Sequence, residues 1–179
     1  MATEPDGIQP DRKDWTWVLQ RPCLECGFTP EVGRDQLAAA MAASIPGWAD
    51  RLADRDAGTR VSPSRWSALE YAAHVRDMAQ VMRYRLGLIL NQDEPLFPDW
   101  DQDGAAVAGD YRAQDHEVVA RDLAAAVTEL AGAYADLPAQ AWDRGGRRSN
   151  GARFTAYTLG LYALHDLQHH RHDAAVAQG

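Results

Sequence analysis

The stretch WSALEY (residues 66–71) decides the fold, because it opens the clearest helical run of the chain, WSALEYAAHVRDMAQVMRYRLGLIL (residues 66–90). Ser67 and Glu70 form an S-x-x-E capping box, in which each side chain accepts a backbone N–H at the helix start. Trp66 precedes the cap and can pack on Tyr71 as a hydrophobic staple. The sequence therefore predicts a helix from Ser67 to about residue 90.

Other segments also have the Ala-rich composition and spacing of helices. Thr29, Pro30 and an early glutamate suit a helix start, and this helix is expected to run to about Ala53. Pro46-Gly47 lies within that span and should kink or split it. The remaining helices are expected at 115–136 and at 152–175, the latter capped by Ser149 or Asn150.

The pattern favours an all-α fold, a four-helix bundle. We find no stretch with the alternation of a strand bounded by hairpin turns. Residues 91–114 form a long crossover with several prolines and glycines, and such long connections are often functional. We expect a tail and a cysteine-containing, irregular lead-in segment over 1–28, followed by the bundle over 29–179.

Composition excludes several classes of protein. The chain has 179 residues, of which 46% are hydrophobic and 25% charged, as in a folded globular domain and unlike a disordered one. Its formal net charge of −8 disfavours a nucleic-acid partner, because the phosphate backbone is also negative. No apolar run approaches the roughly 20 residues that span a bilayer, and the polar N-terminus lacks the apolar core of a signal peptide. We therefore expect a cytoplasmic protein without a membrane partner.

Histidines gather in one short stretch, LHDLQHHRHDA (residues 164–174), which holds four of the six in the chain. His165 and His169 are four residues apart, so on a helix they lie about 40° apart around the axis and can face the bundle core together. Two imidazoles at this spacing can bind one metal ion. His172 shares their side as a further candidate, whereas His170 points about 140° away from His165 and is expected to be solvated.

A third ligand is available on the helix that begins at Ser67. His74 lies two turns into it, and Glu70 and Asp77 share its face. Either carboxylate could orient the imidazole or relay a proton, which makes Asp77 and Glu70 the candidate catalytic residues. If this helix packs against the last one, His74 can join His165 and His169 in a three-histidine site that leaves one position open. The alternative is that His74 is a hydrogen-bonded residue of the core.

The second chemical feature is Cys23-x-x-Cys26 in the lead-in segment. The spacing matches half of a zinc knuckle, but a second cysteine pair is absent from the sequence. Three interpretations remain open: a structural zinc completed by histidines from elsewhere, a dithiol that cycles to a disulfide, and a buried apolar pair. The segment could also fold over the mouth of the bundle and bring the cysteines near the histidines.

The helix WSALEYAAHVRD and the later HDLQHH together resemble the DinB-like superfamily over about residues 30–175. The resemblance implies a DinB/YfiT-like four-helix bundle with His74, His165 and His169 as ligands of a divalent metal, zinc first and nickel or iron as alternatives. The resemblance extends to mycothiol- and bacillithiol-dependent transferases. The N-terminal WTWVLQRPCLECG (residues 15–27) departs from the general pattern of the family.

The function that the resemblance implies is a metal-dependent transferase or isomerase. A divalent ion lowers the pKa of a bound low-molecular-weight thiol, mycothiol in the first instance, and the thiolate attacks an electrophilic substrate. One alternative is a metal- or ligand-binding module without turnover that acts in stress response or sensing. Another is a redox switch built on Cys23 and Cys26. A homodimer is plausible for a bundle of this size.

Overall fold

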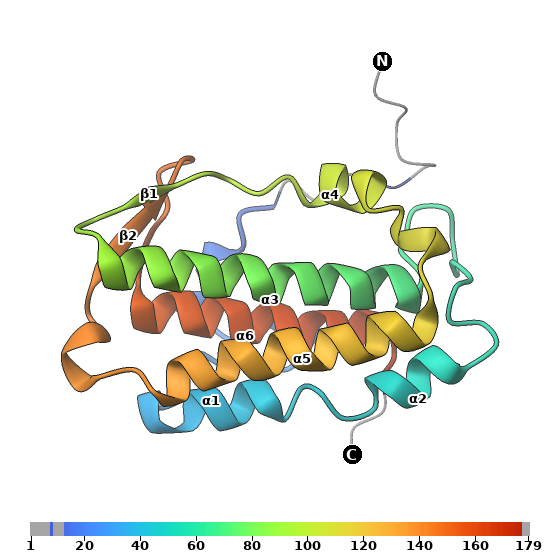
Figure 1. Ribbon diagram of the computed structural model, residues 1–179, viewed down its shortest axis with the longest axis horizontal. Coiled ribbons are helices and arrows are strands. Elements are labelled where there is room, and N and C mark those ends of the chain that lie inside the picture. The colour runs from blue at the N-terminus through green and yellow to red at the C-terminus, as the bar shows by residue number, and fades with distance from the viewer. Residues whose placement is uncertain (1–7, 9–12, 177–179) are drawn as a thin grey trace.

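The computed structural model describes Ile8 and residues 13–176, and most of these residues are helical (Figure 1). Within this described part there are six α-helices and three short 3₁₀ helices, one before α1 and two in the loops between later helices. The α-helices are α1 (Arg34–Ala42), α2 (Trp48–Ala53), α3 (Ala68–Asn91), α4 (Gln102–Ala108), α5 (His116–Ala135) and α6 (Ala156–Asp173). The 3₁₀ helices are η1 (Trp15–Leu19), η2 (Tyr111–Ala113) and η3 (Ala139–Ala141).

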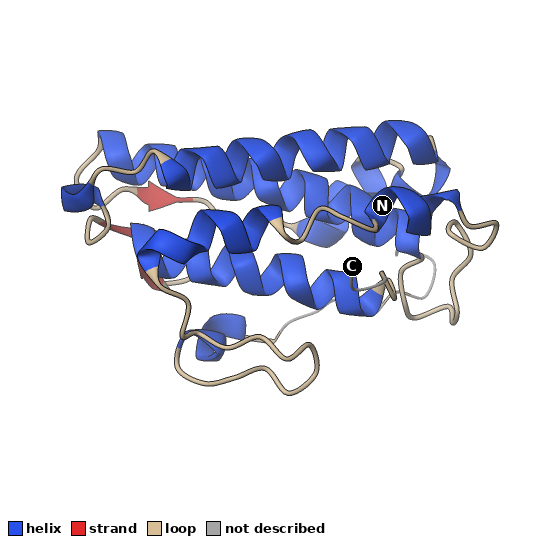
Figure 2. Ribbon diagram, turned by 90° about the horizontal axis from the view of Figure 1, so that it is seen from below, coloured by secondary structure: helices blue, strands red, loops and turns tan. Residues whose placement is uncertain are grey.

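Four of these helices form the bundle. The long helices α3, α5 and α6 run side by side, and α1 completes the bundle on the far side of α5 from α3 (Figures 1 and 2). Helix α3 packs against α5 and α6, and α1 packs against the same two helices. The buried side chains between them form one apolar core, which includes Leu37, Met41, Leu69, Met78, Leu123, Leu130, Leu159 and Leu164. The four-helix bundle expected from the sequence is confirmed.

Helix α3 begins as predicted. The Glu70 N–H donates to the Ser67 hydroxyl, and the Ser67 N–H donates to the Glu70 carboxylate at 2.9 Å. Trp66 packs edge-on against Tyr71, with ring centroids 5.6 Å apart. The Glu70 carboxylate also accepts hydrogen bonds from Nε and Nη2 of Arg60, so it fastens the loop before α3 to the helix start.

The expected first helix is split into α1 and α2 around Pro46-Gly47, as predicted, and Gly47 adopts φ 88° there. Two helix starts differ from the sequence-based expectation. Helix α1 starts at Arg34 rather than near residue 30. Helix α6 starts at Ala156, and its cap is Thr155 rather than Ser149 or Asn150. The residues before this cap are extended instead of helical.

The expectation of an all-α fold is wrong in one respect, because the described residues include a small sheet. Its strands are β1 (Leu96–Phe97), β2 (Gly145–Arg148) and β3 (Arg153–Thr155), with β1 parallel and β3 antiparallel to β2. Strands of two to four residues are too short to show a period of two, and two glycines open β2, although glycine is depleted in strands. The sheet ties the crossover loop to the segment that precedes α6.

The structure describes the lead-in segment from residue 13 onward. It lies along α6, and Val18, Cys23 and Phe28 are buried in the common core. The expected N-terminal tail falls mostly outside the described residues, and the division of the chain at residue 28 stays a prediction. Every helix of the described residues is too short or too polar to traverse a lipid bilayer.

Glu70 gives a stability prediction with a defined pH dependence. Burial raises the pKa of Glu70, but the hydrogen bonds from Arg60 and Ser67 outweigh burial and hold that pKa below its usual 4.5. A carboxyl whose pKa is lower in the folded state stabilises the fold above its unfolded pKa, and this contribution is lost as the pH falls below about 4.5. Glu70→Gln should lower the free energy of unfolding at pH 7 by about 2–4 kcal/mol, because a neutral amide no longer balances the Arg60 charge at this buried helix start.

Urea unfolding at pH 7 and pH 4 measures this effect, and Glu70→Gln should also lose less stability between the two pH values than the parent chain does. The matched control is Glu129→Gln, because the Glu129 side chain is 59% exposed in its ion pair with Arg83. Its expected change is below about 0.5 kcal/mol. Equal effects of the two substitutions would contradict the structural role of Glu70.

Gly160 gives a second prediction, because α6 approaches its neighbours closely there. A Cβ at this position would lie 2.5 Å from Leu37 Cδ2 and 2.8 Å from Tyr134 Cε1, and both side chains are buried. Gly160→Ala should therefore cost about 1–3 kcal/mol by overpacking. Gly132→Ala on α5 meets no atom of the described chain within 4 Å and should stabilise by about 0.5–1 kcal/mol. In thermal unfolding, Gly160→Ala should lower the midpoint temperature and Gly132→Ala should raise it. An increase for both variants would contradict the packing described.

Candidate metal centre

Helix α6 presents two buried histidines to the lead-in segment. His165 and His169 are 1% and 6% exposed, with ring centroids 5.0 Å apart. Trp15 of η1 packs on both rings, at centroid distances of 5.2 Å and 4.8 Å. Phe28 meets the His165 ring edge-on at 5.3 Å. The two imidazoles are thus enclosed by aromatic side chains from the segment that precedes α1.

A tight turn in the same segment brings both cysteines to these histidines. The Gly27 N–H donates to the Cys23 carbonyl at 2.9 Å, and the Cys23 N–H donates to the Phe28 carbonyl at 2.9 Å. Gly27 has φ 77°, a conformation that L side chains rarely adopt. One ligand atom from each of Cys23, Cys26, His165 and His169 lies within 4.8 Å of all the others. Cys23 Sγ is 3.7 Å from His169 Nδ1.

The protonation states of these histidines suit metal binding. Burial, together with the neighbouring His169, lowers the pKa of His165 to about 3. Burial also lowers the pKa of His169, although Asp173 opposes it. Both rings are therefore neutral at pH 7, which is the form that binds a metal. Both ring nitrogens of His165 are buried and find no hydrogen-bonding partner among the described residues.

His74 is the second buried imidazole without a hydrogen-bonding partner among the described residues. It is 1% exposed, and neither of its ring nitrogens has a hydrogen-bonding partner in the described part of the chain. Its ring stacks on Trp100 at 5.3 Å and packs against Trp66 at 5.2 Å. Burial lowers its pKa well below the usual 6.5, and His170 adds to this shift.

His170 meets His74 and is not solvated, contrary to the sequence-based expectation. The two rings are 4.6 Å apart and nearly perpendicular. His170 Nδ1 is 3.1 Å from Asp173 Oδ2, so the carboxylate fixes the orientation of this imidazole. The Tyr71 ring also stacks on His170, with ring centroids 5.4 Å apart. The angle of about 140° between His165 and His170 showed only that His170 does not face the lead-in segment. His170 lies instead on the face of α6 that packs against α3.

The residues singled out by the sequence therefore lie in two neighbouring groups. His165 and His169 join the cysteines, as one interpretation of the Cys-x-x-Cys motif foresaw, while His74 contacts His170. The set of His74, His165 and His169 as ligands of one ion stays a prediction. His172 is exposed at the end of α6.

The candidate acid–base residues of α3 are engaged elsewhere. Glu70 holds the helix cap and Arg60. Asp77 accepts from Arg76 at 2.7 Å and from the hydroxyl of Tyr111 at 2.5 Å. Within the described residues neither carboxylate is hydrogen-bonded to His74. Helical spacing alone could not predict these partners. Arg60 comes from the loop before α3 in the chain, and Tyr111 comes from η2, which follows α3.

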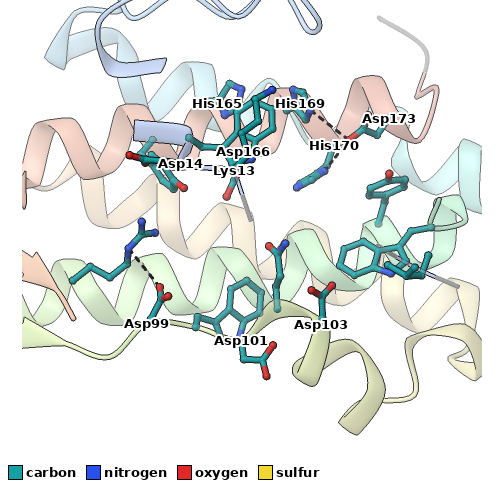
Figure 3. A pocket seen from close by; sticks show the side chains of 18 of the residues that line it. Lys13, Asp14, Asp99, Asp101, Asp103, His165, Asp166, His169, His170 and Asp173 are labelled. Carbon is teal, nitrogen blue, oxygen red and sulfur yellow. Dashed lines mark hydrogen bonds and ion pairs between the residues drawn. The ribbon is translucent and has the colours of Figure 1, made fainter. Parts of the chain in front are cut away.

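A cavity of about 670 Å³ adjoins both groups (Figure 3). His165, His169 and His170 lie along one wall of it, which α6 supplies, and the crossover loop supplies the opposite wall with Asp99, Asp101 and Asp103. The lining combines aromatic rings with charges of both signs. Its further members include Lys13, Asp14, Trp15, Trp66, Tyr71, Trp100, Arg148, Tyr162, Asp166 and Asp173.

Comparisons with known proteins agree with this architecture. YfiT from Bacillus subtilis, described as a probable metal-dependent hydrolase with an unusual four-helix bundle topology, superposes with a TM-score of 0.66 at 19% sequence identity. The match covers 80% of this chain and 85% of YfiT, and it establishes a shared fold. No curated protein matches the sequence. The family profile of the DinB superfamily matches residues 13–174, so the chain belongs to the DinB superfamily.

Proposed function

We propose that the chain is a metal-dependent enzyme that acts on a small molecule bound in the cavity between α6 and the crossover loop. The observation that carries this proposal is the buried, neutral imidazole of His74, whose two ring nitrogens lack partners in the described chain and whose ring lies against that of His170. Burying an unpaired polar atom is unfavourable, and native proteins retain such atoms mainly where a ligand or a reaction uses them.

The histidines of α3 and α6 fit a divalent ion chemically. They offer imidazole nitrogen donors, which suit zinc first and nickel or iron as alternatives. The set from the sequence is His74, His165 and His169, and the contact between His74 and His170 adds a further donor beside the cavity. His170 is already oriented through Asp173, an arrangement that is common for metal-bound histidines.

The residues around the cavity have roles that follow from their chemistry. The rings of Trp66, Tyr71 and Trp100 enclose the apolar part of a substrate and exclude water from the imidazoles. Lys13 and Arg148 bring positive charge to the lining, where they can hold a carboxylate or another anionic group. A divalent ion bound beside them lowers the pKa of a coordinated thiol or water and so supplies a nucleophile at neutral pH.

The more specific proposal is a thiol-dependent S-transferase or isomerase, with a mycothiol-type thiol as cosubstrate. It is supported by membership of the DinB superfamily and by the sequence resemblance to thiol-dependent members. The description of YfiT as a probable metal-dependent hydrolase suggests water as the alternative nucleophile for the same kind of site. An assay therefore has to supply both nucleophiles.

A second candidate is a metal- or ligand-binding module without turnover. One observation favours it: Glu70 and Asp77, the carboxylates expected to assist His74, make structural hydrogen bonds instead. Such a module would be stabilised by metal and thiol and would leave the electrophile unchanged.

The enzyme proposal is tested with the full chain purified without an affinity tag. Loss of the metal to a chelator should abolish consumption of an electrophile such as an α,β-unsaturated acid or an activated ester, and returning zinc, nickel or iron should restore it. His74→Ala should lower kcat/KM by at least about 100-fold, because the substitution removes a proposed ligand. His172→Ala is the matched control, since His172 is exposed, and it should leave the rate unchanged.

Turnover is measured with mycothiol, with a simple thiol and with water alone as nucleophile. Saturable, metal-dependent thiol consumption supports the transferase, and metal-dependent hydrolysis supports the enzyme but not the thiol. Metal-dependent stabilisation without turnover of any electrophile, or full activity of His74→Ala, would contradict the proposal.

A further inference from the structure

The cysteine turn and the buried face of α6 converge on one point. We infer that Cys23, Cys26, His165 and His169 bind one zinc ion as a closed, four-ligand site, separate from the chemistry proposed for the cavity. This inference goes beyond the proposed function, because it assigns His165 and His169 to a structural ion and leaves His74 and His170 beside the cavity.

Distances support a tetrahedral site. Zinc binds sulfur at about 2.3 Å and imidazole nitrogen at about 2.0 Å, which places the ligand atoms of a tetrahedron about 3.3–3.8 Å apart. Cys23 Sγ and His169 Nδ1 are already 3.7 Å apart, and all four ligand atoms lie within 4.8 Å of one another. Small side-chain rotations therefore suffice to close the site.

The backbone of the turn is arranged as a ligand loop. The Gly27 N–H bonds back to the Cys23 carbonyl, and Gly27 takes a positive φ that redirects the chain immediately after Cys26. This turn holds the two thiols on the same side, toward α6. The spacing of four on α6 provides the other two ligands from successive turns of one helix.

The surroundings of His169 favour the same assignment. Its Nδ1 is directed at Cys23, while its Nε2 lies 3.7 Å from Glu25 Oε2 and 3.7 Å from Asp173 Oδ2. A metal-bound histidine commonly directs its second nitrogen toward a carboxylate, which fixes its tautomer. Glu25 comes from the cysteine turn itself, between the two proposed sulfur ligands.

The charge of the proposed site suits its burial. Two thiolates, two neutral imidazoles and one Zn²⁺ sum to zero, so the loaded site can lie among Trp15, Phe28 and the core without an uncompensated ion. Thiolate sulfur selects zinc over magnesium and calcium. The metal also gives a partner to a nitrogen of His165, which a disulfide between the cysteines would leave unpaired.

The consequence is structural. Four protein ligands leave no open position for substrate, which is the mark of a structural zinc. The ion would fasten the segment from residue 13 to residue 28 onto α6. Because Lys13, Asp14 and Trp15 of that segment line the cavity, the ion would set one wall of the substrate site without touching the substrate.

The test is metal analysis and cobalt spectroscopy on the full, untagged chain and on three variants. The parent should hold one tightly bound zinc per chain, and its cobalt form should show sulfur-to-cobalt charge transfer with the visible bands of a tetrahedral ion. Cys23→Ser/Cys26→Ser should lose this ion and the charge-transfer band. His74→Ala and the exposed control His172→Ala should retain both, and far-UV circular dichroism checks that each variant is folded.

Several outcomes would overturn the inference. One is a cobalt spectrum without sulfur ligation in the folded parent, and another is full reactivity of both thiols toward a thiol reagent in the zinc-loaded protein. Loss of the zinc in His74→Ala would also overturn it, because that result assigns the ion to the three-histidine set. A failure of the proposed function is distinguishable: the four-ligand zinc would remain in His74→Ala while no electrophile is consumed by any form.

Discussion

The structure depends on one constraint, the burial of imidazole nitrogens that the described chain leaves without a partner. His74 on α3 and His165 on α6 are almost fully enclosed, and all four of their ring nitrogens are in this condition. An unsatisfied buried polar group costs about 1–3 kcal/mol, so the bundle carries this cost beside its main cavity. A coordinated metal ion removes it for one nitrogen of each ring, and the same burial keeps the rings neutral and ready to bind.

Helix α6 connects the two halves of this arrangement. One of its faces meets the cysteine turn through His165 and His169, and the adjacent face meets α3 through the contact of His170 with His74. Asp173 lies near both His169 and His170 and is thus shared between the two groups. Asp173 and one turn of α6 therefore connect the lead-in segment to the side chains that line the cavity.

Local signals in the sequence predicted the bundle and the histidine-rich helix, since caps and helical spacing are encoded by neighbouring residues. The capping box of α3 and the pair His165/His169 are of this kind. The short strands and the cap at Thr155 were missed because neither produces a periodic pattern. The partners of Glu70 and Asp77 and the contact of His170 with His74 depend on how distant segments pack, which helical spacing does not contain.

The central claim is that these unpartnered imidazoles are metal ligands. Its most direct test is anomalous X-ray diffraction at the zinc absorption edge, on crystals of the full chain grown with zinc. The account predicts an anomalous peak about 2.0–2.3 Å from the ligand atoms of Cys23, Cys26, His165 and His169, and metal-edge scattering beside His74 when the cavity site is loaded. Ordered waters bonded to the ring nitrogens of His74 and His165, with no anomalous peak near either, would contradict it.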